Sequence, residues 1–252
     1  MNRLLRLSAF TLAMAAVAAA PLLAEPARRP SLNEFASDFQ TVPVMGNTPG
    51  LQGARFQTYV AILNPTDASY PVDVTLYLPS GATQMKTIAL GPGELKTYPN
   101  FLDDIFDYTG GGAVTFRSPN SANRFIIDAE VWTTGDQRYG TDIPSLEFAG
   151  SASPSFAPGV ANNATTRTNV GCFNQSGVAN VIGVRVRDHA GTTVSTTALS
   201  LPAHGWGQVG ITGVVTDGYV ELEPEEAAVC YAVVVDNETN DGRFISATEY
   251  QP

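Results

Sequence analysis

Hydrophobic and polar residues alternate in a stretch of the chain that occurs twice. The first copy has a short apolar segment (58–64), an Asn-led turn and a strictly alternating segment (72–78). The second copy, at 168–188, has the same parts in the same order 110 residues later. A period of two is typical of a β-strand with one buried and one exposed face. The pattern therefore predicts two copies of one β unit.

Other extended segments follow each copy and are separated by turns rich in glycine and proline. The segments 112–116 and 127–131 of the first copy match 218–222 and 232–236 of the second. Only residues 100–106 have a helix-like pattern. Short strands at such spacing, with almost no helix, favour β-sandwiches over βαβ units. We therefore expect an all-β fold with two tandem immunoglobulin-like β-sandwich domains.

Composition divides the chain into five parts. Residues 1–24 have a positive start, an apolar run too short to span a bilayer and small residues, which predicts a signal peptide cleaved after Ala19 or Ala24. The polar, proline-bearing residues 25–38 predict a flexible leader. Residues 149–163, rich in Ser, Ala, Pro and Gly, indicate a linker or an edge strand. The domains are then expected at 39–148 and 164–252, in a secreted or periplasmic protein without membrane insertion after cleavage.

The charge of the chain narrows the range of partners. The sequence has 24 acidic and 14 basic residues, a net charge of −10. A field of this sign repels phosphate backbones and anionic lipids, so nucleic acid and membrane surfaces are excluded as expected partners. Simple solubility is the other explanation of the charge.

Two cysteines, Cys172 and Cys230, both lie in the second half of the chain. In an exported protein an even pair is first interpreted as a disulfide. Both cysteines occupy positions that are apolar in the first copy, Ile62 and Phe125. We therefore expect a disulfide that faces the core and joins the two sheets of the second sandwich, with two buried thiols as the alternative.

Two charges of the second copy have no charged counterpart in the first. Asp236 corresponds to Val131, and Arg167 corresponds to Gln57. Because both charges occur together in one copy only, we expect a structural ion pair between Arg167 and Asp236.

The outward face of one long strand also differs between the copies. The first copy places Asp128 and Glu130 there, whereas the second has Tyr231, Val233 and Val235. An exposed apolar stripe of this kind indicates an interface. Either the linker, a terminus or the first domain covers it, or another chain docks there, for example by strand addition at an edge.

A resemblance covers roughly residues 40–250. In the first half it rests on Val42, Pro43, Val44, Gly50, Gly53, Arg55, Thr58, Asn64 and Pro65. In the second half it rests on Arg167, Asn169, Gly171, Asn174, Trp206, Gln208, Tyr231, Asn237, Thr239 and Asp241. These residues resemble a two-lobed β module of secreted bacterial proteins, and each half is similar to bacterial cell-adhesion-related immunoglobulin-like domains. The resemblance implies the fold and export, without a mechanism.

Candidate chemistry is sparse in the sequence. His189 and His204 both lie in turn sequences without a recognisable catalytic partner, so we expect no enzyme activity and no cofactor. Asp103, Asp104 and Asp107 offer oxygen ligands for calcium, although acids at the start of a short helix also act as caps. Residues 236–242 resemble a calcium loop, but a hairpin turn held by Asx side chains explains them better because Ala247 occupies the position of the bidentate Glu.

The expected function follows from these observations. We expect a secreted, non-catalytic β-sandwich module with a structural, adhesive or protein-interaction role at or outside the cell envelope, whose partner is a protein or a surface glycan. One alternative is a carbohydrate- or calcium-dependent binding module with ligand loops near Asp103 and Trp132. Another is a self-assembling surface subunit in which residues 31–45 add to the sheet of a neighbouring copy.

Overall fold

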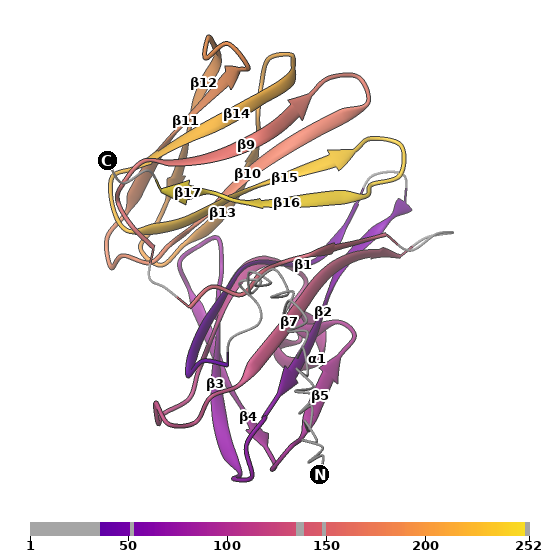
Figure 1. Ribbon diagram of the computed structural model, residues 1–252, viewed down its shortest axis with the longest axis vertical. Helices are drawn as coiled ribbons and strands as arrows, with labels where there is room; N and C mark the ends of the chain where they lie inside the picture. The colour runs from indigo at the N-terminus through magenta and orange to yellow at the C-terminus, as the bar shows by residue number, and fades with distance from the viewer. Residues whose placement is uncertain (1–35, 51–52, 135–138, 148–149, 250–252) are drawn as a thin grey trace, which may run out of the picture.

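The computed structural model describes residues 36–50, 53–134, 139–147 and 150–249. This part of the chain forms antiparallel β-sheets, and its one helix is the short α1 (Phe101–Phe106). The predicted all-β fold class is thus confirmed. The strands form two halves that are stacked end to end (Figure 1). The predicted signal peptide and residues 25–35 of the predicted leader lie outside the described residues.

The first half is built around one curled sheet. Its strand order is β4-β3-β6-β1-β2-β7-β8, with β5 paired to β2. Because β1 pairs with β6 along most of its length and with β2 at its end, it connects the two layers of this half. The strands are β1 (Phe39–Pro49), β2 (Arg55–Leu63), β3 (Tyr70–Tyr77), β4 (Thr83–Leu90), β5 (Leu95–Tyr98), β6 (Gly110–Arg117), β7 (Ile126–Thr134) and β8 (Gly140–Asp142).

The second half has two separate sheets. Their strand orders are β13-β10-β15-β16 and β12-β11-β14-β9-β17. The first half has the same succession of strands in its layers β5-β2-β7-β8 and β4-β3-β6-β1. The strands are β9 (Ser155–Asn162), β10 (Thr166–Asn174), β11 (Asn180–Asp188), β12 (Thr193–Leu201), β13 (Trp206–Gly210), β14 (Val215–Pro224), β15 (Ala228–Asp236), β16 (Gly242–Ser246) and β17 (Thr248–Glu249).

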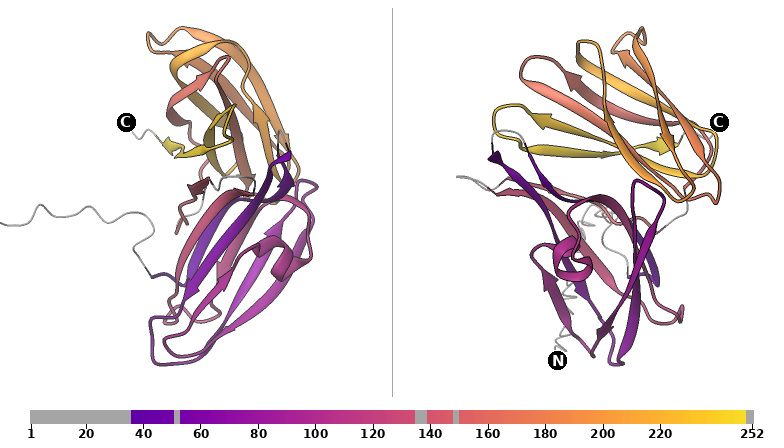
Figure 2. Two further views of the ribbon diagram at one scale, coloured as in Figure 1. Left: turned by 90° about the vertical axis from the view of Figure 1, so that its right-hand side faces the viewer. Right: turned by 180° about the vertical axis from the view of Figure 1, so that it is seen from behind.

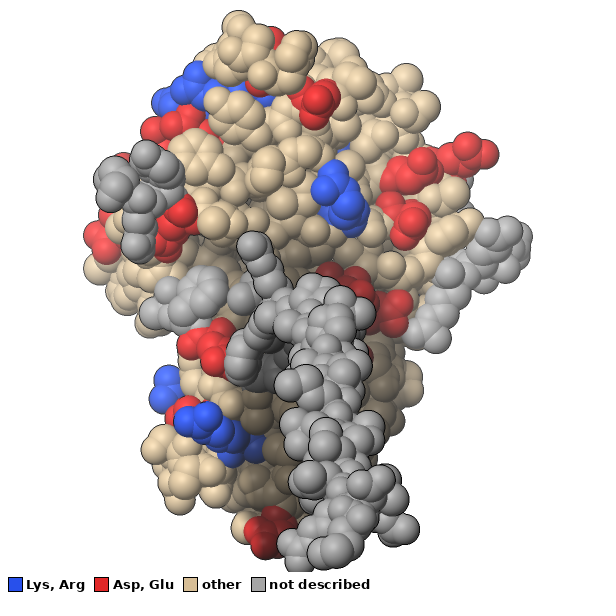
Figure 3. All heavy atoms as spheres, viewed as in Figure 1, with Lys and Arg blue, Asp and Glu red and all other residues tan. Residues whose placement is uncertain are grey.

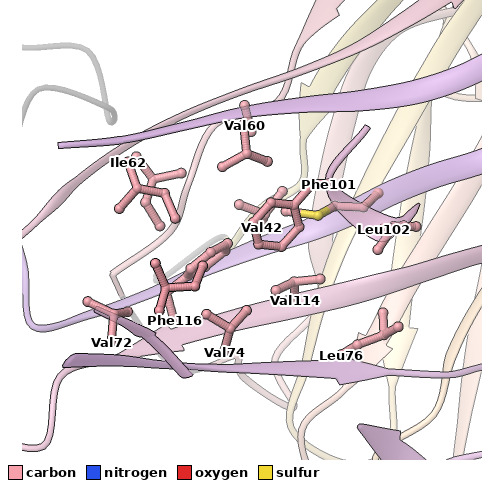
Figure 4. Packing of buried hydrophobic residues seen from close by; sticks show 14 of the residues in the cluster. Val42, Val60, Ile62, Val72, Val74, Leu76, Phe101, Leu102, Val114 and Phe116 are labelled. Atoms are coloured by element: carbon pink, nitrogen blue, oxygen red, sulfur yellow. The ribbon is translucent and has the colours of Figure 1, made fainter. Parts of the chain in front are cut away.

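Each half encloses its own hydrophobic core. The alternating positions predicted to face inward in β3 and β11 are fully or almost fully buried. Figure 4 shows how side chains of β2 lie opposite those of β3 and β6, with residues of α1 at one end. Burial of one such side chain stabilises the fold by about 1.5–3 kcal/mol. The labelled residues are Val42, Val60, Ile62, Val72, Val74, Leu76, Phe101, Leu102, Val114 and Phe116.

A buried asparagine ends the second strand of each half. The Nδ2 of Asn174 donates hydrogen bonds to the carbonyls of Val178 and Pro202, each 2.7 Å long. Its Oδ1 accepts from the N–H and the hydroxyl of Ser176, at 3.1 and 2.9 Å. Asn64 makes the corresponding four contacts in the first half. The Asn-led turn seen in the sequence is therefore a polar connection that holds the ends of neighbouring strands together.

The Asn174→Ala substitution should lower the free energy of unfolding by about 2–4 kcal/mol. It removes the bonds to the Val178 and Pro202 carbonyls and the acceptor of the Ser176 N–H, and each lost hydrogen bond costs about 0.5–1.5 kcal/mol. Urea denaturation measures the effect. Asn120→Ala is the control, because that exposed side chain accepts one bond, from Ala122 N–H, and its loss should change stability by only about 0.5 kcal/mol. Equal losses in the two variants would contradict this role of Asn174.

The predicted boundaries require two corrections. Residues 149–163, assigned to a linker or an edge strand, contain strand β9, which pairs with β14 along its length and with the short edge strand β17 at Ser155 and Phe156. The predicted leader extended to residue 38, but Ser37 already pairs with Phe125. Strand pairing between distant segments decides both points, and local composition does not report it.

Most of the segment proposed for self-assembly, residues 31–45, pairs with strands of its own chain. From Phe39 onward it belongs to β1, which pairs with β6, and Thr41 also pairs with Leu146 on the other side. This part therefore has partners along both edges.

The predicted disulfide between Cys172 and Cys230 is present, and both residues are buried. Its expected position was wrong in one respect. The two cysteines lie directly opposite each other on the neighbouring strands β10 and β15, so the bond lies within one sheet and does not join the two sheets.

Candidate functional site at the contact between the halves

The predicted apolar stripe on β15 faces the first half of the same chain. Tyr231 is completely buried and belongs to the same hydrophobic cluster as the core of the first half. Val235 is 5% exposed, and Val233 packs against the same cluster. Of the alternatives stated for this stripe, the structure shows coverage by the first half.

Trp206, the first residue of β13, makes two hydrogen bonds to the first half. Its indole N–H donates to the carbonyl of Pro43 at 3.0 Å, and its backbone N–H donates to the carbonyl of Leu78 at 3.3 Å. Pro43 lies where the register of β1 with β6 shifts, at a β-bulge. The ring lies so close to Gly111 that a Cβ there would be 2.7 Å from its Cη2. A glycine is therefore required at this position for the close approach.

Aromatic residues complete this contact. The rings of Tyr77 and Phe173 are 4.5 Å apart, and Tyr231 stacks on Phe244 at 5.2 Å. Burial raises the pKa of the Tyr231 hydroxyl, which donates to Oε1 of Gln208 at 3.2 Å. We call the contact region the joint; it consists of Pro43, Tyr77, Leu78, Gly111, Phe173, Trp206, Tyr231 and Phe244.

A groove of about 620 Å³ opens beside the joint. The first half supplies one wall from β1, β2 and β7, and the second half supplies the other from β10, β13 and β15 (the two halves are seen from the side in Figure 2). Much of the lining is apolar. The apolar side chains include Val44, Met45, Phe56, Val131, Leu199 and Val233.

Five polar residues of the second half line the groove, and three of them stand on the sheet that contains β10 and β13. Arg167 and Asn169 are two residues apart on β10, and Gln208 lies on the adjacent strand β13. Alternate residues of a strand share a face, so all three project from the outer face of this sheet. Within the described ranges the Asn169 side chain and the Gln208 Nε2 have no hydrogen-bond partner. They are available to a ligand in the groove.

Arg167 has other partners than the one predicted for it. Its Nη1 donates to Asn237 Oδ1 at 3.0 Å, and its Nη2 donates to Asn240 Oδ1 at 2.9 Å. Burial lowers the pKa of the guanidinium, and the charge of Asp236 opposes this shift. The predicted pair Arg167–Asp236 is thus an electrostatic interaction, while the hydrogen bonds go to neutral amides.

The carboxylate of Asp236 holds the hairpin turn between β15 and β16. Its Oδ1 accepts hydrogen bonds from the N–H groups of Thr239 and Glu238, at 2.8 and 2.9 Å, and from the Thr239 hydroxyl at 3.0 Å. These bonds lower the pKa of Asp236, and the bond from the Thr239 N–H contributes most to this shift. Asn240 occupies the left-handed region at φ 60°, which Asn tolerates. The hairpin interpretation of residues 236–242 describes this loop well.

The acids proposed for calcium have structural positions around α1. Asp104 Oδ2 accepts from the Asn100 N–H at 3.0 Å, and Asp107 ends the helix in the left-handed region. In the described ranges, no three His, Cys, Asp or Glu side chains are grouped as metal ligands. Trp132, assigned to the same loops, donates its indole N–H to the Pro99 carbonyl at 3.3 Å.

The two histidines lie apart from the groove. His204 adopts φ 57° in the turn before β13, with its ring 6.3 Å from that of Tyr77. His189 borders a separate shallow depression near Phe156 and Tyr219. The structure does not bring the two histidines together.

The sequence analysis named Trp206 only among the residues of the resemblance and predicted neither its contact with the first half nor the groove. In the structure the counterpart of Trp206 is Leu95, because Leu63 pairs with Leu95 in the first half as Phe173 pairs with Trp206 in the second. Leu95 is 58% exposed, whereas Trp206 packs against the core of the first half. Comparison of the two copies did identify the stripe of Tyr231, Val233 and Val235.

No family model matches the sequence, and the comparison with curated proteins finds no similar chain. Among the described residues, no helix has the length and apolar character needed to cross a membrane. The geometry of the joint and of the groove is therefore the basis on which a function is argued.

Proposed function

We propose that the protein is a secreted, non-catalytic module with a structural, adhesive or protein-interaction role at or outside the cell envelope. It consists of two tandem immunoglobulin-like β-sandwich domains, and its binding site is the groove between them. The observation that carries this proposal is the joint. Its aromatic contacts and the Trp206–Pro43 hydrogen bond hold two sandwiches in one orientation.

A fixed orientation matters because the groove takes one wall from each half. Small-molecule and cofactor sites occur preferentially at domain interfaces, where concave surfaces form without disturbing either core. A preorganised groove also avoids the entropic cost of ordering the two walls when a ligand binds. The geometry thus suits recognition.

Two further observations support the tandem arrangement and export. The strand orders of the two halves correspond, and both halves contain the buried asparagine at the end of the second strand. Such correspondence is expected after duplication of one ancestral domain. Disulfides persist in oxidising compartments, so the Cys172–Cys230 bond favours a secreted or periplasmic protein.

Site-specific photo-crosslinking in bacterial cells tests the proposal. A photoreactive residue at Gln208, exposed in the groove, should give a defined covalent adduct with an envelope component when the full chain is expressed. The matched position is Met85, which is 68% exposed on β4, outside the groove; it should give none. Adducts at both positions, or at neither, would contradict a binding role for the groove. A hydrolytic activity abolished by His204→Ala would contradict the non-catalytic function.

A further inference from the structure

We propose that the groove binds an amphiphilic monocarboxylate, that is, an anion with one carboxylate and one aliphatic chain. The carboxylate contacts Arg167, and the chain lies along the apolar wall. This inference rests on the proposed function, because it names the ligand class of the same groove.

The charge of the groove differs from that of the rest of the protein. The chain carries a net charge of −10, and acidic side chains are distributed over both halves on the face shown in Figure 3. The described residues that line the groove include a single charged one, the positive Arg167. A ligand with one negative charge is therefore complementary to this site, whereas a cation finds no counter-charge among the described lining residues.

The positive charge of Arg167 is not neutralised by a carboxylate within hydrogen-bond distance. Arg185 and Arg187, on the other sheet of the same half, both contact Glu221 at 2.9 Å. Arg167 instead donates to the amide oxygens of Asn237 and Asn240. The two amides orient the guanidinium, and the carboxylate of Asp236 acts on it only through its charge, without a hydrogen bond.

The hydrogen-bonding capacity around Arg167 suits a carboxylate. A guanidinium has five N–H donors, and the two asparagines accept from one donor on each Nη. The amide of Asn169 lies two residues further along the same face, at the groove. Arginine binds carboxylates through charge-assisted and often bidentate hydrogen bonds, and the neighbouring amide adds a further donor.

The remaining lining suits an aliphatic chain. Val44, Met45, Phe56 and Val233 border the groove, and its volume of about 620 Å³ lies within the range of small-molecule sites. Each methylene that becomes buried should tighten binding by up to about fourfold. A chain on the order of ten carbons gains enough apolar contact to make the site specific for amphiphiles.

A charge-matched ligand series tests the inference. The protein has two tryptophans, so Trp132→Phe leaves Trp206 of the groove as the only indole. Dodecanoate, dodecanol and dodecyltrimethylammonium are titrated below their critical micelle concentrations while Trp206 emission is recorded. Dodecanoate should give a saturable change with an affinity at least tenfold above that of dodecanol, and the cation should give none.

Two variants test the contribution of the second-half wall. Arg167→Gln should weaken dodecanoate binding at least tenfold and leave dodecanol binding unchanged. Asn169→Asp places a negative charge beside the carboxylate and should weaken dodecanoate binding to a similar extent. This second variant retains Arg167 and its turn contacts, so it remains informative if Arg167→Gln is unfolded by circular dichroism. Arg117→Gln is the control, because it removes the same charge from an exposed position that contacts Phe39, outside the groove.

Several results would overturn the inference. Equal affinities for dodecanoate and dodecanol would show that the carboxylate does not contribute to binding. Unchanged dodecanoate binding in the folded variants would show the same, and in both cases the groove would remain a binding site. Absence of a saturable signal with all three amphiphiles would exclude this ligand class. Tighter binding of an apolar peptide than of dodecanoate would also overturn it. The crosslinking experiment at Gln208 does not depend on the amphiphile, so failure of the proposed function is seen separately.

Discussion

Replacing Trp206 by alanine should lower the free energy of unfolding by about 2–3 kcal/mol and separate the unfolding of the two halves. Truncating a fully buried tryptophan costs about 3–5 kcal/mol, and Trp206 is half-buried, which reduces the expected loss. The variant also removes the indole N–H that donates a hydrogen bond to the Pro43 carbonyl. The largest consequence is loss of cooperation between the halves, because the indole packs against the core cluster of the first half and donates a hydrogen bond to it.

Guanidinium denaturation followed by two probes measures this uncoupling. In Trp206→Ala, the remaining indole, Trp132, reports the first half, whereas far-UV circular dichroism reports both halves. The two transitions should no longer coincide, which is the test for loss of two-state unfolding. Small-angle scattering should show a larger radius of gyration.

Two control variants distinguish the effect of losing the contact at the joint from the general effect of losing an indole. Trp132→Ala removes the other tryptophan, which lies outside the joint, and should destabilise the protein without a change in the radius of gyration. Gly111→Ala places a Cβ against the Trp206 ring and should be costly in the wild type but nearly neutral in Trp206→Ala. Additive effects of these two substitutions would mean that the ring and Gly111 are not in contact.

Removing the disulfide should be the most destabilising change to the second half. Replacing Cys172 and Cys230 together by alanine should lower its free energy of unfolding by about 4 kcal/mol, the chain-entropy value for a loop of 58 residues. For a unit of roughly 100 residues this corresponds to a decrease in Tm of about 15 °C or more. Replacing both residues avoids leaving one unpaired thiol in the core.

The first half is an internal control for this experiment, because it has no cysteine. Differential scanning calorimetry with and without a reducing agent should show a downward shift of the second-half transition. In Trp206→Ala, where the two transitions are resolved, the first-half transition should keep its Tm. An unchanged second-half transition in the double alanine variant would show that strand pairing alone holds β10 against β15.

Much of the fold could be predicted because strand formation depends on a local pattern. In β3 and β11 the alternation of apolar and polar residues specified which side chains are buried, and the structure agrees at Val72, Val74, Ile182 and Val184. The two Asn-led turns were visible for the same reason, since Asn64 and Asn174 bond mainly to groups close in sequence. The presence of a disulfide followed from the number of cysteines and the expected compartment.

Relations between distant strands could not be obtained in this way. Periodicity identifies the face of a strand that is buried, but it does not name the strand or the half that covers it. For this reason the Cys172–Cys230 bond was expected between sheets, although the register of β10 with β15 places it within one. The same limit applies to residues 155–162, whose composition indicated a linker and whose pairing with β14 makes them a strand.

The joint and the groove show this division most clearly. The chain alone specified two all-β units, their repeat and an apolar stripe at Tyr231, Val233 and Val235, because each of these is encoded in local residue order. The partner of the stripe, the Trp206–Pro43 contact and the position of Arg167 in a groove with two walls depend on how two folded surfaces meet. That contact joins residues as many as 163 positions apart, and no local pattern records which distant surface will be complementary.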